Sequence, residues 1–345
     1  MLTHRPGSLM AATVEEASIE AAVWKHKGAL EEMKSNELFE CTLALRREMH
    51  GYPVHVECRD VESGSGTSTN APRVAFQGDR LAMDSPVCLR SWSDLHDPGS
   101  EARRNFVAIF NARGFCVLQS SEEDFSTLDL HSLFGGFVPH AFADARGRVT
   151  IDPSVEQCSR NVRDTQAEHQ PHTDEAYSCE PGAVITMQCE VAARSGGETI
   201  LISAKAMYDA AAASLAPEQL EALFSPCLTV GRALPGSEEV QEAVIPIFSQ
   251  LGDGRVAVRW RSRDAYLVSV TAEADAGYRF LEDFVADPRN RIHLRLQPGQ
   301  VIIIDNRSLL HGRLPFPVHE RRRYIRTNFY NNGSLQSELA LGFAA

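Results

Sequence analysis

The segment EHQPHTDEAY, residues 168–177, contains the densest group of metal-ligand side chains in the sequence. One residue separates His172 from Asp174. On a β-strand, residues two apart point to the same face, so this imidazole and carboxylate could converge on one metal ion. A His-x-Asp pair alone also fits a polar surface loop whose Asp caps a helix. The interpretation therefore depends on what accompanies the pair.

A second histidine, His311, follows an apolar run in VIIIDNRSLLHGRLPF, residues 301–316. Two histidines and one carboxylate on one face of a metal leave three octahedral positions open, which suits Fe(II) that must also bind a chelating co-substrate and O2. Structural zinc sites instead use four protein ligands and are closed. The basic run HERRRYIR follows at residues 319–326.

With these residues the sequence resembles the Fe(II)/2-oxoglutarate-dependent dioxygenases of the taurine dioxygenase (TauD/TfdA) and clavaminate synthase-like family. The family pattern is H-x-D/E, a Gly-Gly-x-Thr turn, a distal His and an Arg-x-x-x-Arg pair. The matching residues here are His172 with Asp174, Gly196-Gly197-Glu198-Thr199, His311, and Arg322 with Arg326. Thr199 stands 27 residues after His172, and the two arginines stand 11 and 15 residues after His311, spacings similar to the family's.

The resemblance covers about residues 100–330 and implies a mainly β protein with flanking helices, a double-stranded β-helix or jelly roll. It implies Fe(II), 2-oxoglutarate and O2 as cofactor and co-substrates, with His172, Asp174 and His311 as the iron ligands. Arg322 would form a bidentate salt bridge with the distal carboxylate of 2-oxoglutarate, for which a planar guanidinium suits better than an ammonium. Thr199 would add a hydroxyl donor. The alternative is that Arg322 is a solvated member of the basic run at residues 319–326 and does not bind 2-oxoglutarate.

Substrate contacts are predicted less directly. By resemblance, Arg326 would contact the substrate or support the co-substrate site. Arg326 and Arg313 favour an anionic substrate, although Arg313 fits a structural role equally well. The loop FGGFVPHAF, residues 134–142, lies where relatives place a substrate-facing loop, so His140 and Phe142 are candidates, with ordinary packing as the alternative. Glu168, followed by His169 and Gln170, precedes the metal motif and completes this set.

The implied reaction hydroxylates an aliphatic C–H bond of a small carboxylate-bearing metabolite, such as an amino acid or natural-product intermediate, and releases succinate and CO2. Desaturation or cyclisation would use the same ligands. Because Asp174 is present, the halogenase variant, which lacks the carboxylate, is disfavoured. The alternative class is a non-catalytic metal-binding jelly roll. A hydrolase is disfavoured because the sequence has no G-x-S-x-G motif.

The elements around the motifs are short. A helix is predicted near residues 100–113, ending at Gly114 and leading into the strand FCVLQ. The runs at 183–190 and 198–203, joined by a Ser-Gly-Gly turn, are predicted to form an antiparallel pair. Ser203 and Pro217 mark two helix starts. Further strands are predicted within 255–260, 292–297, 301–305 and 323–330.

The N-terminal part has a different composition. Residues 11–50 are rich in Ala, Glu, Leu and Lys without Pro, which favours helices, and residues 62–73 are Ser/Gly/Thr-rich, which indicates a linker or long loop. We therefore predict a helical N-terminal extension and linker over residues 1–75 and a dioxygenase domain over residues 76–345.

Composition excludes several classes of function. Lys plus Arg number 34 against 46 Asp plus Glu, a net charge of −12, which disfavours nucleic acid and anionic membranes as partners. The sequence shows no membrane-spanning run and no secretory signal. Its eight cysteines include no C-x-x-C pair. We expect a cytoplasmic protein that acts on a small molecule and could form a homo-oligomer.

Overall fold

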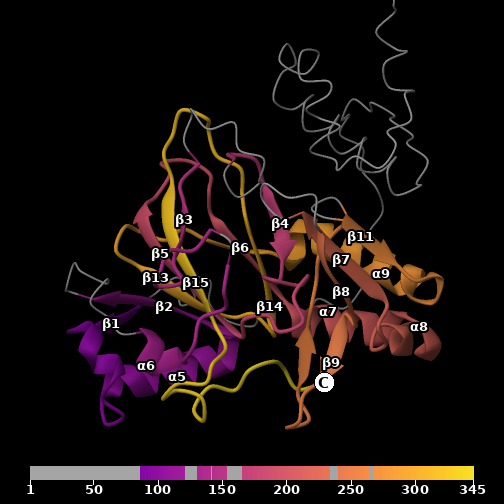
Figure 1. Ribbon diagram of the computed structural model, residues 1–345, viewed down its shortest axis with the longest axis horizontal. Helices are drawn as coiled ribbons and strands as arrows, with labels where there is room; N and C mark the ends of the chain where they lie inside the picture. Colours follow the sequence, from indigo (N-terminus) through magenta and orange to yellow (C-terminus); the bar gives the residue numbers. More distant parts are fainter. Residues whose placement is uncertain (1–85, 121–129, 141, 154–164, 234–239, 264–266) are drawn as a thin grey trace, which may run out of the picture. The chain divides into compact units, whose positions relative to one another are not determined.

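The computed structural model describes residues 86–120, 130–140, 142–153, 165–233, 240–263 and 267–345 (Figure 1). The helices predicted within residues 11–50, the linker at 62–73 and the boundary near 75 lie outside the described residues.

The largest sheet has six strands in the order β1-β2-β13-β5-β15-β3. All neighbours in it are antiparallel except β1 and β2. Its strands are β1 (Val87–Leu89), β2 (Phe115–Ser120), β3 (Val149–Ile151), β5 (Val184–Val191), β13 (Val301–Asp305) and β15 (Arg323–Phe329).

A second, four-stranded sheet has the order β12-β6-β14-β4. Its strands are β4 (His169–His172), β6 (Thr199–Ser203), β12 (Ile292–Leu294) and β14 (Leu309–Arg313). The predicted antiparallel pairing of residues 183–190 with 198–203 is wrong, because β5 pairs with β13 and β15 while β6 pairs with β12 and β14. The Gly-Gly turn therefore carries the chain from one sheet to the other, and the PGQ turn between β12 and β13 does the same.

The two sheets share an apolar core. Ile185, Ile302 and Tyr324 from the six-stranded sheet pack with Leu201 and Leu309 from the four-stranded sheet, and all are buried. Alternating side chains of two facing sheets form such a core in a jelly roll. The predicted mainly β jelly roll with flanking helices is confirmed.

One group of helices covers the outer side of the six-stranded sheet. Helix α5 (Glu101–Arg113) begins at Ser100, whose hydroxyl accepts the Arg103 N–H, and ends at Gly114 in the left-handed region with φ 77°. Both ends are as predicted. Phe106 and Phe110 of α5 pack against β1, β2 and β13, joined by α6 (Leu130–Phe134) and the 3-10 helix η2 (Trp92–Leu95).

A second group of elements lies beyond β4 and β14 (Figure 1). A three-stranded sheet, β11-β7-β8, shares a buried cluster with three helices and with the hairpin β9-β10. Ser203 and Pro217 begin α7 and α8 as predicted, whereas α9 and the three-stranded sheet were not predicted. The elements are α7 (Ala204–Ser214), α8 (Pro217–Ala222), β7 (Leu228–Ala233), β8 (Val240–Ile245), β9 (Phe248–Gln250), β10 (Val256–Val258), β11 (Leu267–Val270), α9 (Ala272–Ala286) and the 3-10 helix η5 (Pro288–Asn290).

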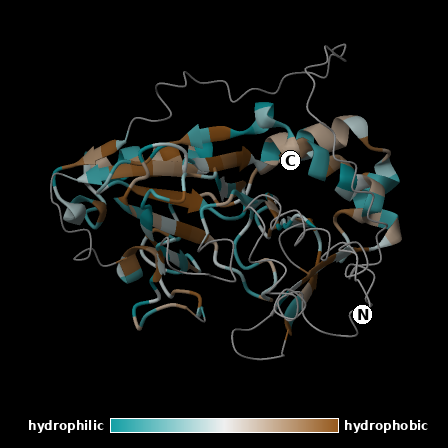
Figure 2. Cartoon of the chain, turned by 90° about the horizontal axis from the view of Figure 1, so that it is seen from above, coloured by the Kyte–Doolittle hydropathy of each residue, from teal (hydrophilic) through white to brown (hydrophobic). Residues whose placement is uncertain are grey.

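Hydropathy follows this arrangement. In Figure 2 several strands are brown, whereas the helices carry both teal and brown residues, as expected of helices with one face against a core. Within the described part of the chain, no helix combines the length and the apolar character that crossing a membrane requires.

Candidate metal centre

Two neighbouring strands bring the two predicted histidine ligands together. β14 pairs antiparallel with β4, and His311 is the direct partner of His172 in the register. Their ring centres are 4.4 Å apart. Directly opposite residues on paired strands point to the same face, so both imidazoles enter the same space although 139 positions separate them in the sequence (311 − 172).

Asp174 reaches the histidines from a turn. We expected His172 and Asp174 to share one strand, but β4 ends at His172 and Asp174 begins a turn. Asn306 holds this turn in place, because its side chain accepts the Asp174 N–H at 2.8 Å and donates to the carbonyls of Asp174 and Gly182. Thr173 is fixed by Trp260, whose N–H donates to the Thr173 hydroxyl at 2.9 Å.

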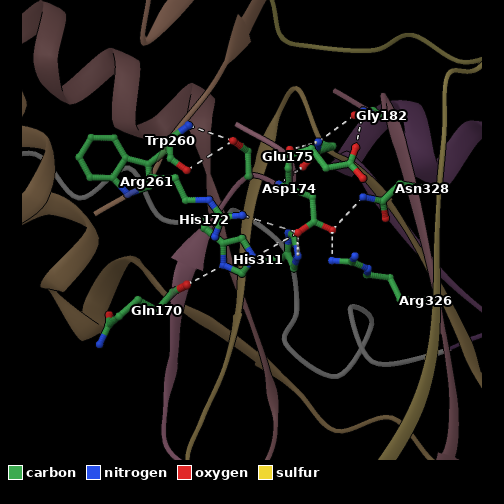
Figure 3. A network of polar contacts seen from close by, with 12 residues as sticks. Gln170, His172, Asp174, Glu175, Gly182, Trp260, Arg261, His311, Arg326 and Asn328 are labelled. Carbon is green, nitrogen blue, oxygen red and sulfur yellow. Dashed lines mark hydrogen bonds and ion pairs between the residues drawn. The ribbon is translucent and has the colours of Figure 1, made fainter. Parts of the chain in front are cut away.

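The three ligand groups form a compact set (Figure 3). Asp174 Oδ1 lies 3.3 Å from His172 Nε2 and 3.7 Å from His311 Nε2, and all three side chains are buried. Two ligands about 2.1 Å from a metal and at right angles would be about 3 Å apart. Among the described residues, these three form the one group of His, Cys, Asp and Glu side chains close enough to hold a metal ion.

The protonation states suit a divalent metal. Burial lowers the pKa of His311 to about 3, and the nearby His172 adds to this effect. Burial and Arg261 also lower the pKa of His172. Burial alone would raise the pKa of Asp174, but Arg326 and the two histidines hold it well below its usual value. Two neutral imidazoles and one carboxylate are the deprotonated ligands that metal binding needs.

Groups behind the ligands fix their orientation. The Gln170 carbonyl lies 2.7 Å from His172 Nδ1, so this nitrogen donates and Nε2 presents its lone pair to the centre. Asp174 Oδ2 accepts from Arg326 at 2.7 Å and from Asn328 at 3.0 Å, which leaves Oδ1 facing the imidazoles. Arg326, predicted to contact substrate, thus contacts a metal ligand, and its substrate contact stays a prediction.

Sequence reasoning missed Asn306, Asn328 and Arg261. A guanidinium nitrogen of Arg261 lies 4.0 Å from Asp174 Oδ1, and its side chain is 2% exposed. The signals in the sequence were weak: Asn328 is two residues after Arg326 on the same strand face, and Arg261 belongs to the alternating RWRSR run at 259–263. Neither pattern indicates which distant residue the side chain contacts.

Arg322 and Thr199 lie near the Gly-Gly turn. Arg322 is 4% exposed, its Nε donates to the Gly197 carbonyl at 3.0 Å, and its guanidinium stacks on Tyr324. Burial lowers its pKa. Within the described residues it forms no ion pair, and the Thr199 hydroxyl, also buried, has no hydrogen-bond partner. By contrast Arg321 is exposed and pairs with Asp152.

The turn needs both of its glycines. Gly196 and Gly197 have φ values of 66° and 71°, in the left-handed region. A β-carbon on Gly196 would overlap the Pro315 carbonyl, and one on Gly197 would lie 3.2 Å from Arg322 Cδ. The two glycines therefore allow the turn to approach Arg322 closely.

Two other predicted substrate residues make contacts within the protein. Arg313 donates to the carbonyls of Thr165 and Ala167, both at 2.6 Å, and so holds that segment on β14. Glu168 pairs with Arg291 at 2.9 Å. Substrate contacts by Arg313 and Glu168 stay predictions.

His140 and Phe142 meet two residues that the sequence did not single out, Arg232 of β7 and Tyr177. Arg232 donates to the Tyr177 hydroxyl, and its NH1 lies 3.2 Å from His140 Nε2. Its guanidinium carbon is 5.1 Å and 5.6 Å from the ring centres of Tyr177 and Phe142. We call these four residues the Arg232 cluster.

The chain matches a known protein family over most of its length. The model of the family described as "Taurine catabolism dioxygenase TauD, TfdA family" matches residues 83–328. The chain belongs to this family. The match includes all three residues of the metal centre as well as Thr199, Arg322 and Arg326, and it extends the expected 100–330 at its start.

The curated relatives are more specific. The chain is 32% identical over 135 residues to a uridine-5'-phosphate dioxygenase from Amycolatopsis sp, an alignment that covers 38% of this chain and 48% of the relative. It is 33% identical over 142 residues to a protein of the same name from Streptomyces sp, covering 39% and 51%. The chain thus spans about half the length of the curated relatives it matches.

Solved structures share the fold. The non-heme iron oxygenase OrfP in complex with Fe and alpha-ketoglutaric acid matches with a TM-score of 0.52 at 18% identity, covering 67% of this chain and 80% of that one. OrfP in complex with Fe and L-Arg matches with a TM-score of 0.51 at 17% identity, covering 75% and 87%. This is similarity of fold.

Proposed function

We propose that the protein is an Fe(II)- and 2-oxoglutarate-dependent oxygenase that hydroxylates an aliphatic C–H bond of a small anionic substrate and releases succinate and CO2. One observation carries the proposal. A buried set of two neutral imidazoles and one carboxylate lies in the same barrel as a buried arginine that forms no ion pair among the described residues. This combination suits a metal that shares its coordination sphere with a dicarboxylate.

His172, Asp174 and His311 would hold the iron. Their separations of 3.3 and 3.7 Å fit ligands on one face of an ion, and the residues behind them fix one carboxylate oxygen and one imidazole nitrogen toward it. Iron with 2-oxoglutarate and O2 supplies the oxidising power that an unactivated C–H bond requires. The chain's own task is to bind and orient the substrate in a dry site.

Arg322 would bind the distal carboxylate of 2-oxoglutarate through its guanidinium, with the Thr199 hydroxyl as a further donor. The buried Thr199 hydroxyl without a partner supports this, since a native protein rarely leaves such a group unsatisfied. The buried charge of Arg322 supports it as well, because an unpaired buried charge is costly.

The substrate would be a small anionic metabolite, either a carboxylate-bearing compound such as an amino acid or natural-product intermediate, or a nucleotide. The arginines near the centre favour an anion, and the two curated relatives are named for a nucleotide. Arg326, Arg313, His140, Phe142 and Glu168 remain the proposed substrate contacts. Desaturation and cyclisation, which use the same ligands, are the alternative outcomes.

Anaerobic addition of Fe(II) and 2-oxoglutarate tests the metal and co-substrate assignment. The wild type should develop a weak visible metal-to-ligand band. His172→Ala and His311→Ala should lose it while keeping the fold, since these side chains lie at the metal centre and outside the apolar clusters. A colourless wild-type mixture would favour the alternative of a non-catalytic metal-binding jelly roll.

Succinate formation with product mass tests the reaction. Candidate carboxylates and nucleotides are screened for substrate-dependent succinate. A mass gain of about 16 means hydroxylation and a loss of about 2 means desaturation or cyclisation, since these correspond to one oxygen gained or two hydrogens lost. Full activity in His311→Ala would contradict the assignment of the centre.

We propose three further properties of the chain. Residues 1–75 would form an extension separate from the dioxygenase domain at 76–345. The composition supports a cytoplasmic protein whose partner is a small molecule, with neither nucleic acid nor a membrane surface. Association into a homo-oligomer is compatible with the sequence.

A further inference from the structure

Asp174 depends on a turn for its position in the metal centre. His172 and His311 face each other on paired strands, but β4 ends at His172 and Asp174 lies outside it. The turn is tight, because the Ser178 N–H donates to the Glu175 carbonyl, three residues back, at 2.8 Å. The shape of this turn therefore decides where the Asp174 carboxylate points.

The turn contains an unfavourable backbone conformation at Glu175, whose φ is 58°. Among the described residues, Asn331 is the other non-glycine residue with a positive φ, and asparagine adopts this region more readily than glutamate. Such a conformation persists when the surrounding structure holds it in place. The turn that carries Asp174 therefore needs contacts from other parts of the chain.

Two residues hold the start of the turn. The Asn306 side chain binds the N–H and the carbonyl of Asp174. Thr173 donates its N–H to the Trp260 carbonyl at 3.1 Å, and its hydroxyl accepts the Trp260 N–H at 2.9 Å (Figure 3). Both contacts lie before Glu175 in the chain, so the carbonyls after it need a different partner.

Arg259, which precedes Trp260 and follows β10, holds the end of the turn. One of its guanidinium nitrogens, NH2, donates to the Ala176 carbonyl at 3.1 Å and also to the Ser178 carbonyl. The side chain is partly buried, and burial lowers its pKa to about 10, which leaves it charged at neutral pH. Hydrogen bonds from a charged donor are stronger than neutral ones.

We infer that Arg259 is a positioning residue for the metal ligand Asp174, an inference that rests on the proposed function. Glu175 keeps its unfavourable φ because Asn306 fixes the backbone before it and Arg259 fixes the backbone after it, at Ala176. The carboxylate therefore points at the imidazoles before a metal binds, and it loses little freedom when the metal arrives.

Hydrogen exchange of the metal-free protein tests whether Arg259 holds the turn. In Arg259→Met, which removes the charge and both hydrogen bonds, the amides of Ser178 and Gly182 should exchange at least about 10-fold faster than in the wild type, since both N–H groups donate to Glu175. The amide of Ile302, in the buried strand β13, should exchange at the wild-type rate.

Anaerobic Fe(II) titration in the presence of 2-oxoglutarate, followed by the visible band, tests the effect on the metal centre. Arg259→Met should bind Fe(II) at least about 10-fold more weakly, the usual effect of losing a residue that orients a metal ligand. Arg259→Lys should bind within about threefold of the wild type. A single nitrogen makes both contacts here, and an ammonium group has three N–H donors.

Arg255→Met is the matched control. Arg255 lies at the other end of β10 and also donates to backbone carbonyls, those of Leu341 at 2.8 Å and of Gly342. Its loss should lower stability in urea while keeping the Fe(II) affinity and the exchange rates of the turn. Should Arg259→Met not fold, Arg259→Gln takes its place, with at least about threefold weaker Fe(II) binding expected because the charge is lost.

Three results would overturn the inference: an unchanged Fe(II) affinity in the neutral Arg259 variant, unchanged exchange of the turn in its metal-free form, or an equal loss of affinity in Arg255→Met. A wild-type protein without the visible band would instead refute the proposed function itself. The exchange rates of the metal-free proteins would still decide whether Arg259 holds the turn, so the two failures are distinguishable.

Discussion

Asp174 uses its two carboxylate oxygens for different contacts. Oδ2 accepts from Arg326 and Asn328, and Oδ1 faces the two histidines. The backbone of the same residue is held by Asn306. A carboxylate fixed in this way loses little freedom on binding a metal, and it presents one oxygen with defined geometry. These contacts could not be deduced from the H-x-D motif, since the partners come from β15 and from the turn after β13, both far away in the sequence.

Arg322 gives the sharpest prediction for a single residue. Arg322→Lys should raise the KM for 2-oxoglutarate by about 10-fold or more with a smaller effect on kcat, because an ammonium cannot replace a bidentate contact with a carboxylate. Steady-state succinate formation at varied 2-oxoglutarate measures this. Arg321→Lys is the matched control, since Arg321 is adjacent, exposed and paired with Asp152. An unchanged KM in Arg322→Lys would mean that another cation binds the distal carboxylate of 2-oxoglutarate.

At the scale of elements, the close approach of β4 and β14 aligns the histidines. Gly312 follows His311 in β14, and a β-carbon there would lie 2.5 Å from the His169 carbonyl oxygen and 3.0 Å from the Pro171 nitrogen. Sterics therefore explain why glycine occupies position 312, because any larger residue would separate the two strands that carry His172 and His311.

Gly312→Ala should therefore weaken Fe(II) binding and lower stability by roughly 1–3 kcal/mol, the usual cost of overpacking. Fe(II) titration monitored by the visible band and urea unfolding measure the two effects. Gly252→Ala is the matched control, because a β-carbon on Gly252 would meet no atom within 4 Å. Equal Fe(II) affinity in the Gly312 and Gly252 variants would contradict this account of the strand pair.

Helix ends and strand positions, which have local signals, were predictable from the sequence. The pairing of the strands into sheets was less predictable. The end of α5 at Gly114 was predictable because a cap acts within a turn of the chain, and the structure adds Ser100 as the cap at its start. β5 and β6 were recognisable as strands, but their assignment to different sheets depends on β13 and β14, which lie about 100 residues later. In contrast, the motif spacing predicted that His172, Asp174 and His311 lie together. No pattern in the sequence indicated Arg232 or Arg261.

At the scale of the whole molecule, the three metal ligands and the groups seen to orient them lie in the described part of the chain. Both sheets and all three ligand residues lie within residues 86–345, and the family match begins at residue 83. Deletion of residues 1–75 should therefore keep the visible Fe(II)/2-oxoglutarate band and cooperative unfolding. Circular dichroism and anaerobic titration of the shortened chain measure this. Loss of soluble protein on deletion would show that these residues belong to the core.

Asp305 connects distant parts of the domain and should make its stability depend on pH. It ends β13, is 1% exposed, and its carboxylate accepts the Gly342 N–H at 2.7 Å and the Arg307 N–H at 2.8 Å. Burial raises its pKa from 3.8 to about 6, although these donors and the Ser308 hydroxyl oppose the shift. The folded state therefore retains a proton that the unfolded chain has lost, and the contribution of Asp305 to stability falls as pH rises from about 4 to 6.

Asp305→Asn should remove this dependence, because the amide stays neutral at every pH. The amide oxygen replaces the carboxylate imperfectly, so the variant carries a constant cost of its own. Relative to the wild type, however, its free energy of unfolding should increase by up to about 3 kcal/mol between pH 4 and pH 7, at 1.36 kcal/mol for each unit of pKa shift. Urea unfolding of both proteins across this range measures the difference. Parallel stability profiles would mean that the proton on Asp305 is not linked to folding.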